Sequence, residues 1–178
     1  MNKKLLFIGA LAVAATAAQS HVSLEDPQAA AGGGYKAVLR VSHGCEGTAT
    51  HTVTVRLPAG FRGAKPMPKA GWTVAITRAP LDQPYESHGR KVTDDVVEIS
   101  WKADSRERWL ADAHYDEFVL RGQAPETPGP AWFKVRQQCE KGEWNWAEVP
   151  ASGTSTKGLK APAVLLDVQP KAAAGHVH

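Results

Sequence analysis

Hydrophobic and polar residues alternate along most of the chain with a period of two, and helical periodicity is scarce. Successive side chains of a strand point to opposite faces, so this alternation is typical of strands with one buried face. In the segment THTVTVRLP, for example, valine and leucine occupy one face and threonine and arginine the other. The pattern predicts strands over residues 35–41, 50–58, 71–79, 95–101, 116–122, 131–139 and 163–170.

The stretches between these segments are rich in glycine and proline, which interrupt strand ladders and form turns. Residues 58–72, 79–90 and 121–131 are therefore predicted to be connections, and residues 103–112 to hold one helical turn at most. Strands at this spacing, without internal repeats, favour an all-β fold. We expect an immunoglobulin-like antiparallel β-sandwich of about 7–9 strands.

Residues 1–20 have the three parts of a secretory signal peptide, with Lys3 and Lys4 before an apolar run and small residues before the cleavage point. The apolar run is about 13 residues, shorter than the roughly 20 that a bilayer span needs. Cleavage after Ser20 would leave a chain that begins at His21. We therefore predict export to the periplasm or the extracellular space, a β-sandwich domain over residues 21–170, and a flexible histidine-containing tail over 171–178.

The charge of the chain excludes some partners. The formal net charge is +3, and the two lysines of the predicted signal account for most of it, which leaves +1. No basic tract or stripe is present, so a nucleic acid is not expected as a partner. No later segment is apolar enough to span a membrane.

Cys45 and Cys139 are the only cysteines. In an exported chain two cysteines most simply form one disulfide, and neither belongs to a CxxC metal motif. The bond would close a loop of about 95 residues and stabilise the fold by at most about 4–5 kcal/mol. It would also hold the segment around residue 45 against the segment around residue 139.

A histidine at the new amino terminus is a potential copper ligand. The free α-amine and the ring Nδ1 of His21 can close a chelate ring on one metal ion. Two nitrogen donors of this kind suit Cu(II), which prefers tetragonal N,O coordination. Every exported chain has some first residue, however, so His21 alone leaves the metal site open.

Two glutamates are candidates for an oxygen ligand. Glu25 is close in sequence, but four extended residues span about 13 Å, and the bend at Asp26 and Pro27 comes too late to bring it back. Glu46 lies in a glycine-bracketed turn after a predicted strand, next to Cys45, and is the better placed carboxylate. An ordinary solvated turn is the alternative interpretation of Glu46.

Three segments carry a family resemblance: HVSLEDPQAAAGGGYKAVLRVSHGCEGTATHTVTVRLPAG, KPMPKAGWTV and FKVRQQCEKGEWNWAEVP. From His21 to about Pro150 the chain resembles the YcnI-like family of exported copper-binding domains. The resemblance implies an immunoglobulin-like sandwich in which a single-histidine brace binds Cu(II). Carried over, the brace falls on His21, the carboxylate on Glu46 and an adjacent tryptophan on Trp146, although the HGCEG turn is longer here than in some members.

Trp146 also has a physical argument of its own. An indole face attracts a cation and excludes water from one side of it, whereas the alternative is a plain core tryptophan. Trp144 shares a face with Trp146 if the segment is extended, so it is the second candidate.

The predicted function is that of an extracytoplasmic Cu(II)-binding protein, not an enzyme, that chaperones or buffers copper and exchanges it with another copper-handling protein. One alternative is a copper-dependent polysaccharide monooxygenase, which would need a second imidazole from His51, His88 or His114. The other is a metal-free adhesion or structural module, because a sandwich fold does not determine function.

Overall fold

The computed structural model describes residues 21–171. The predicted signal peptide and residues 172–178 of the predicted tail lie outside the described residues. Within 21–171 the chain forms eleven strands and one short 3₁₀ helix, η1 (Arg106–Arg108), at the position of the predicted helical turn. No helix in this part of the chain is long and apolar enough to cross a membrane.

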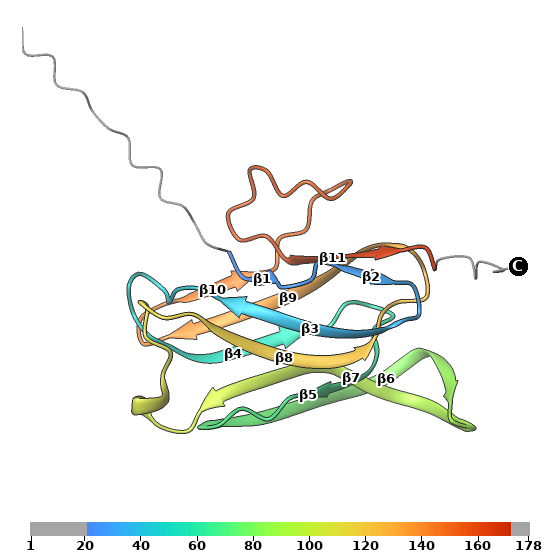
Figure 1. Ribbon diagram of the computed structural model, residues 1–178, viewed down its shortest axis with the longest axis horizontal. Coiled ribbons are helices and arrows are strands. Elements are labelled where there is room, and N and C mark those ends of the chain that lie inside the picture. The colour runs from blue at the N-terminus through green and yellow to red at the C-terminus, as the bar shows by residue number, and fades with distance from the viewer. Residues whose placement is uncertain (1–20, 172–178) are drawn as a thin grey trace, which may run out of the picture.

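The strands form the two sheets of a β-sandwich, which confirms the predicted fold class (Figure 1). The first sheet has four antiparallel strands, in the order β1 (Ser23–Leu24), β3 (Gly34–Val41), β8 (Asp116–Gln123) and β5 (Arg62–Pro66). The second runs β2 (Gln28–Ala30), β11 (Val164–Gln169), β9 (Gly129–Cys139), β4 (Thr50–Arg56), β7 (Arg90–Ala103) and β6 (Trp72–Ser87).

The seventh strand of the second sheet, β10 (Glu143–Trp146), pairs with the carboxyl-terminal half of β9. The amino-terminal half of β9 pairs instead with β11, so one edge of β9 has two neighbours in succession. The pairings between these strands are antiparallel except that of β2 with β11, which is parallel. This arrangement places β10 near the end of β3, beside the start of β1 (Figure 1).

The seven strands predicted from alternation are all present, but eleven strands exceed the expected 7–9. The four extra strands are β1, β2, β5 and β10, which have two to five residues each and are too short for a clear period. β5 lies inside the predicted connection 58–72. The predicted connection 79–90 is instead the distal part of a long β6–β7 hairpin, where irregular register and prolines hide the alternation.

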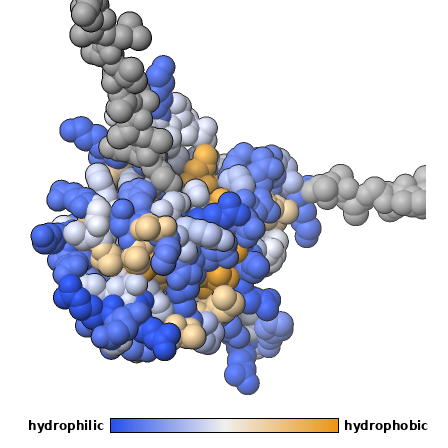
Figure 2. All heavy atoms as spheres, turned by 60° about the vertical axis from the view of Figure 1, so that its left-hand side comes forward, coloured by the Kyte–Doolittle hydropathy of each residue, from blue (hydrophilic) through white to orange (hydrophobic). Residues whose placement is uncertain are grey.

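The core lies between the two sheets and is built from the inward residues of the alternating strands. Aromatic side chains fill its centre, including Trp101, Phe118 and Phe133, each of them fully buried. Trp101 and Phe118 come from opposite sheets and meet edge to face, with ring centroids 5.8 Å apart. The face shown in Figure 2 is mostly hydrophilic, with apolar side chains in small separate patches.

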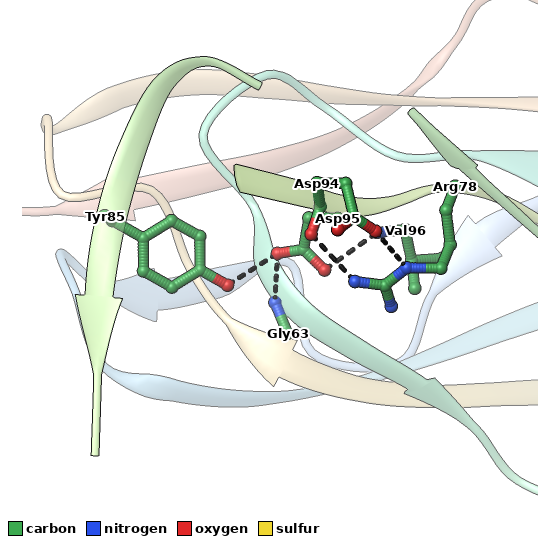
Figure 3. A network of polar contacts seen from close by, with 6 residues as sticks. All are labelled: Gly63, Arg78, Tyr85, Asp94, Asp95 and Val96. Atoms are coloured by element: carbon green, nitrogen blue, oxygen red, sulfur yellow. Dashed lines mark hydrogen bonds and ion pairs between the residues drawn. The ribbon is translucent and has the colours of Figure 1, made fainter. Parts of the chain in front are cut away.

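A buried carboxylate joins the β6–β7 hairpin to β5 (Figure 3). Asp95 is 3% exposed and accepts hydrogen bonds from the Tyr85 hydroxyl (2.7 Å), the Gly63 N–H (2.8 Å) and the Val96 N–H (2.7 Å). Burial alone would raise the pKa of Asp95, but these bonds, with the nearby Arg78 charge, outweigh it and hold the pKa below the ordinary value. Burial and the bond to Asp95 in turn raise the pKa of Tyr85 to about 12.

The disulfide between Cys45 and Cys139 is present, which confirms the predicted pairing. It attaches the turn that follows β3 to the last residue of β9. The turn is thereby fixed at the same end of the sandwich as β10.

Candidate metal centre

The position of His21 follows from the register of β1. Ser23 pairs with Arg40 and Leu24 with Leu39 in an antiparallel ladder. Continued backwards, this register brings residue 21 level with Ser42, where β3 has ended and the turn begins. The first residue of the predicted mature chain therefore lies beside the turn that carries Glu46.

The His21 ring lies against Trp146. The two ring centroids are 5.4 Å apart and the ring planes are tilted by 56°. Trp146 is only 1% exposed, while Trp144 is half-buried and stacks on it with centroids 5.0 Å apart. Because Trp144 and Trp146 alternate with exposed residues on β10, both indoles face the same way, as expected for an extended segment.

The turn after β3 is tightly closed. Cys45 and Thr48 exchange backbone hydrogen bonds of 3.2 and 2.9 Å, and the Thr48 hydroxyl donates to the Cys45 carbonyl at 2.7 Å. Gly44 is required here, because a Cβ at this position would lie 1.7 Å from the Thr48 carbonyl oxygen. The Gly44 N–H donates to Asp112 Oδ1 at 2.9 Å, which attaches the turn to the loop before β8 in addition to the disulfide.

A hollow of about 280 Å³ lies between this turn and the tryptophans. Glu46 is exposed at its edge, in a backbone conformation with φ of +50°. The hollow is lined by His43, Gly44, Glu46, Gly47, Asp112, Trp144 and Trp146. His21 is not part of this lining and approaches the site through its contact with Trp146.

Gln137 connects Trp146 to the turn. It is 1% exposed, and its Oε1 accepts the indole N–H of Trp146 at 3.2 Å. Its Nε2 donates to the His43 carbonyl at 2.6 Å and to the Thr50 hydroxyl at 2.8 Å. One buried amide therefore sets both the orientation of the indole and the position of the turn.

His43 is a second imidazole in this region. Its ring meets Trp146 edge to face, with centroids 6.4 Å apart. Its Nδ1–H donates to the Gly44 carbonyl at 2.6 Å, which leaves Nε2 as the nitrogen available to a ligand.

The other candidate residues do not line the hollow. Glu25 pairs with Arg40 at 3.0 Å on the outer side of the first sheet. His51 packs against Trp109, with ring centroids 5.2 Å apart, while His88 lies at the tip of the β6–β7 hairpin and His114 in the exposed loop before β8. Within residues 21–171, no three His, Cys, Asp or Glu side chains come close enough together to hold a metal ion by themselves.

Sequence reasoning missed Gln137, Asp112 and the contact of His43 with Trp146. Gln137 did carry a signal, because it occupies an inward position of the AWFKVRQQC alternation where an apolar residue is expected. Asp112 carried none, since it lies in an irregular loop and meets Gly44 only through the tertiary fold.

These features define the chain as an immunoglobulin-like β-sandwich with a tryptophan-lined hollow beside His21. Within that class it belongs to the DUF1775 family, described as a domain of unknown function, whose profile matches residues 21–168. DUF1775 is the domain of the YcnI-like proteins, so the resemblance holds at the level of the domain. The family match itself carries no assignment of a metal.

One solved structure supports the fold. An uncharacterized protein from Nocardia farcinica, whose crystal structure reveals an immunoglobulin-like fold, is 25% identical, with a TM-score of 0.63 over 83% of this chain and 97% of that one. The seventh ScaB type I cohesin from Pseudobacteroides cellulosolvens is 10% identical over 89% of this chain and 97% of that one. Its TM-score of 0.37 is too low to indicate a shared fold. No curated protein matches the chain significantly.

Proposed function

We propose that the chain, after export and cleavage before His21, binds Cu(II) at the end of the sandwich where His21, Trp146 and Glu46 gather. The contact between His21 and Trp146 carries this proposal. Trp146 in turn lines the hollow whose edge is formed by Glu46. Three residues far apart in sequence thus lie around one small region.

The donor chemistry of these residues suits the proposal. In the uncleaved chain the His21 nitrogen belongs to a peptide bond, and cleavage turns it into an amine that acts with the ring. Two nitrogens with one carboxylate oxygen match the N,O preference of Cu(II). The proposed ligands are one amino-terminal nitrogen and two side chains. Such a site does not need a cluster of three His, Cys, Asp or Glu side chains.

The proposed role is carriage or buffering of copper outside the cytoplasm, without catalysis. A donor set of one residue and one carboxylate leaves coordination positions open, so the ion can pass to another copper-handling protein. The buried Trp146 shields one side of the site from water. The Cys45–Cys139 disulfide suits an oxidising compartment, in agreement with export.

One observation favours a second candidate function, the copper-dependent oxidation of a polysaccharide. His43 brings a second imidazole to Trp146 and lines the hollow, whereas His51, His88 and His114 are not part of its lining. Oxidised sugar products formed with ascorbate and peroxide by the copper-loaded protein would favour this candidate over carriage. A metal-free adhesion module predicts no specific copper binding at all.

The test compares the protein that begins at His21 with a variant that retains Ser20. Competition with a chromophoric chelator measures the Cu(II) affinity of both. Retaining Ser20 removes the amine from His21, so the affinity should fall by about 100-fold or more. Equal affinities would contradict the proposed amine ligand, and negligible binding by both would favour the metal-free module.

A further inference from the structure

The outer face of the first sheet carries a row of three cations. Arg121 on β8 pairs directly with Lys36 on β3 and with Lys65 on β5, so the three residues are neighbours across three strands. All three are exposed, and none forms an ion pair with an acidic side chain of residues 21–171. Adjacent like charges destabilise a sheet, so this row is unfavourable for the isolated domain.

Apolar residues follow the cation row on the same face. Val38 and Val119 are cross-strand partners, 3% and 8% exposed, and alternation directs them away from the interior. They are buried hydrophobic residues that do not belong to the core cluster. Met67, 54% exposed, joins Val119 through its backbone N–H at 2.8 Å. A second, smaller apolar surface therefore lies outside the core.

The three cations line one concave groove of about 640 Å³ together with Val119 and Met67. The groove is lined by Gly34, Tyr35, Lys36, Lys65, Pro66, Met67, Pro68, Val119, Leu120 and Arg121, without any acidic residue. Its volume falls within the range of ordinary small-ligand sites, which are largely apolar with a few charged groups at fixed points.

This groove is separate from the candidate metal centre. Lys36 lies five residues before the end of β3, a distance of about 17 Å along an extended strand. The candidate metal centre lies beyond that end, around His21 and the turn after β3. Binding of a ligand in the groove would therefore be independent of copper.

We propose that this groove binds an anionic amphiphile, with a phosphate or carboxylate head on Lys36, Arg121 and Lys65 and an apolar chain along Val119 and Met67. The guanidinium of Arg121 sits in the centre of the row and can hold two oxygens of one head group at once. The two lysines flank it at the roughly 4.8 Å spacing of neighbouring strands. An anion in this position relieves the repulsion within the row.

The groove requires both the anionic head and the apolar chain of the proposed ligand. A small inorganic anion would use the cations but leave the exposed Met67 side chain in water. A neutral apolar molecule would leave three adjacent charges without a counter-ion. The concave shape favours a single molecule held in the groove over the flat surface of a bilayer.

The experiment uses three probes on the protein that begins at His21: decyl phosphate, decyl maltoside and inorganic phosphate. The two decyl compounds are titrated below their micelle concentrations, and binding of all three probes is followed by calorimetry and by NMR shifts of the β3, β5 and β8 amides. Decyl phosphate should bind at least roughly tenfold more tightly than either of the others, because only it uses both halves of the groove.

Substitutions of three exposed residues complete the design. Arg121→Gln should weaken decyl phosphate about tenfold or more by removal of the central charge. Met67→Gln should weaken decyl phosphate but leave inorganic phosphate unchanged. Lys102→Gln, an exposed lysine of the other sheet, is the matched control and should change nothing.

Several results would overturn the proposal. Decyl maltoside binding as tightly as decyl phosphate would show that the cations do not select the ligand. Inorganic phosphate binding equally well would reduce the groove to an anion site. Association with anionic vesicles, without binding of monomeric decyl phosphate, would assign the face to a membrane surface. An Arg121→Gln variant that binds like the parent protein would also overturn it.

Discussion

Glu46 occupies a backbone conformation that few residues other than glycine adopt. Its φ is +50°, and Gly47 follows with +75°. Such strained positions gather at functional sites when the surrounding structure enforces them. Here the Cys45 disulfide on one side and the bonded Thr48 on the other enforce the turn. The carboxylate is therefore presented at the edge of the hollow by a rigid backbone.

Glu46→Gln should weaken Cu(II) binding by about tenfold or more, because a neutral amide oxygen is a poorer ligand for Cu(II) than a carboxylate. The side chain is exposed, so the thermal midpoint should stay unchanged. Competition titration and thermal denaturation measure the two effects. Glu25→Gln is the matched control, since it breaks only the exposed pair with Arg40. If Glu46→Gln leaves the affinity unchanged while Glu25→Gln or Asp26→Asn lowers it, the carboxylate is misassigned.

Gln137→Met should destabilise the domain and disturb the candidate metal centre together. The change keeps the side-chain length but leaves the Trp146 N–H and the His43 carbonyl without their partner, at a cost of about 1–3 kcal/mol for each buried group. Urea unfolding measures the stability, while tryptophan emission and Cu(II) affinity report on the site. Gln138→Met, one position further on β9, should have a small effect in every assay. Unaltered emission in Gln137→Met would show that the amide does not orient Trp146.

At the scale of elements, the β6–β7 hairpin consists of the two longest strands and carries one buried carboxylate at its contact with β5. The Asp95 carboxylate accepts hydrogen bonds from the Tyr85 hydroxyl of β6 and from the Gly63 N–H of β5. One ionised group thus bonds to both the hairpin and the edge strand of the other sheet (Figure 3), beside the contact of the Arg62 guanidinium with the Tyr85 ring.

Because its folded-state pKa is lowered, Asp95 should make the stability depend on acid. The ordinary pKa of an unfolded aspartate is about 3.9, so this contribution is complete above about pH 4 and is lost as the pH falls through the lower folded value. Asp95→Asn should therefore remove part of the acid dependence, measured as the free energy of unfolding between about pH 2 and 7. Asp94→Asn, which affects only an exposed pair with Arg78, should keep it. An identical pH profile for Asp95→Asn and the parent protein would contradict this assignment.

At the scale of the whole molecule, alternation was sufficient for the long strands and for the sandwich class. It failed for β1, β2, β5 and β10, because two to five residues do not establish a period and because glycine and proline in β5 resemble a turn. The disulfide followed from composition and the expected compartment.

The candidate metal centre was only partly predictable from sequence. His21 and Trp146 followed from the cleavage point and the family motif, and their contact supports that hypothesis. The roles of Gln137 and Asp112 depend on how β9 and a loop meet the turn, which a linear sequence does not contain. The row of Lys36, Arg121 and Lys65 depends on strand register between distant segments, and register is fixed only in the folded sheet.

Two separate regions of the sandwich therefore offer different chemistry. One end gathers His21, Glu46 and Trp146, and the outer face of the first sheet carries the cationic groove further along β3. The central claim concerns the first of these and depends on an amino-terminal nitrogen that only cleavage creates.

An electron paramagnetic resonance spectrum of the Cu(II)-loaded protein that begins at His21 tests this claim most directly. We predict a tetragonal cupric signal with coupling to an amine nitrogen and a single imidazole, which disappears in favour of a different signal when Ser20 is retained. A spectrum without nitrogen coupling, or one that is the same with Ser20 present, would contradict the account. A signal from two imidazoles that reverts to one in His43→Ala would replace the single-histidine brace with a site that includes His43.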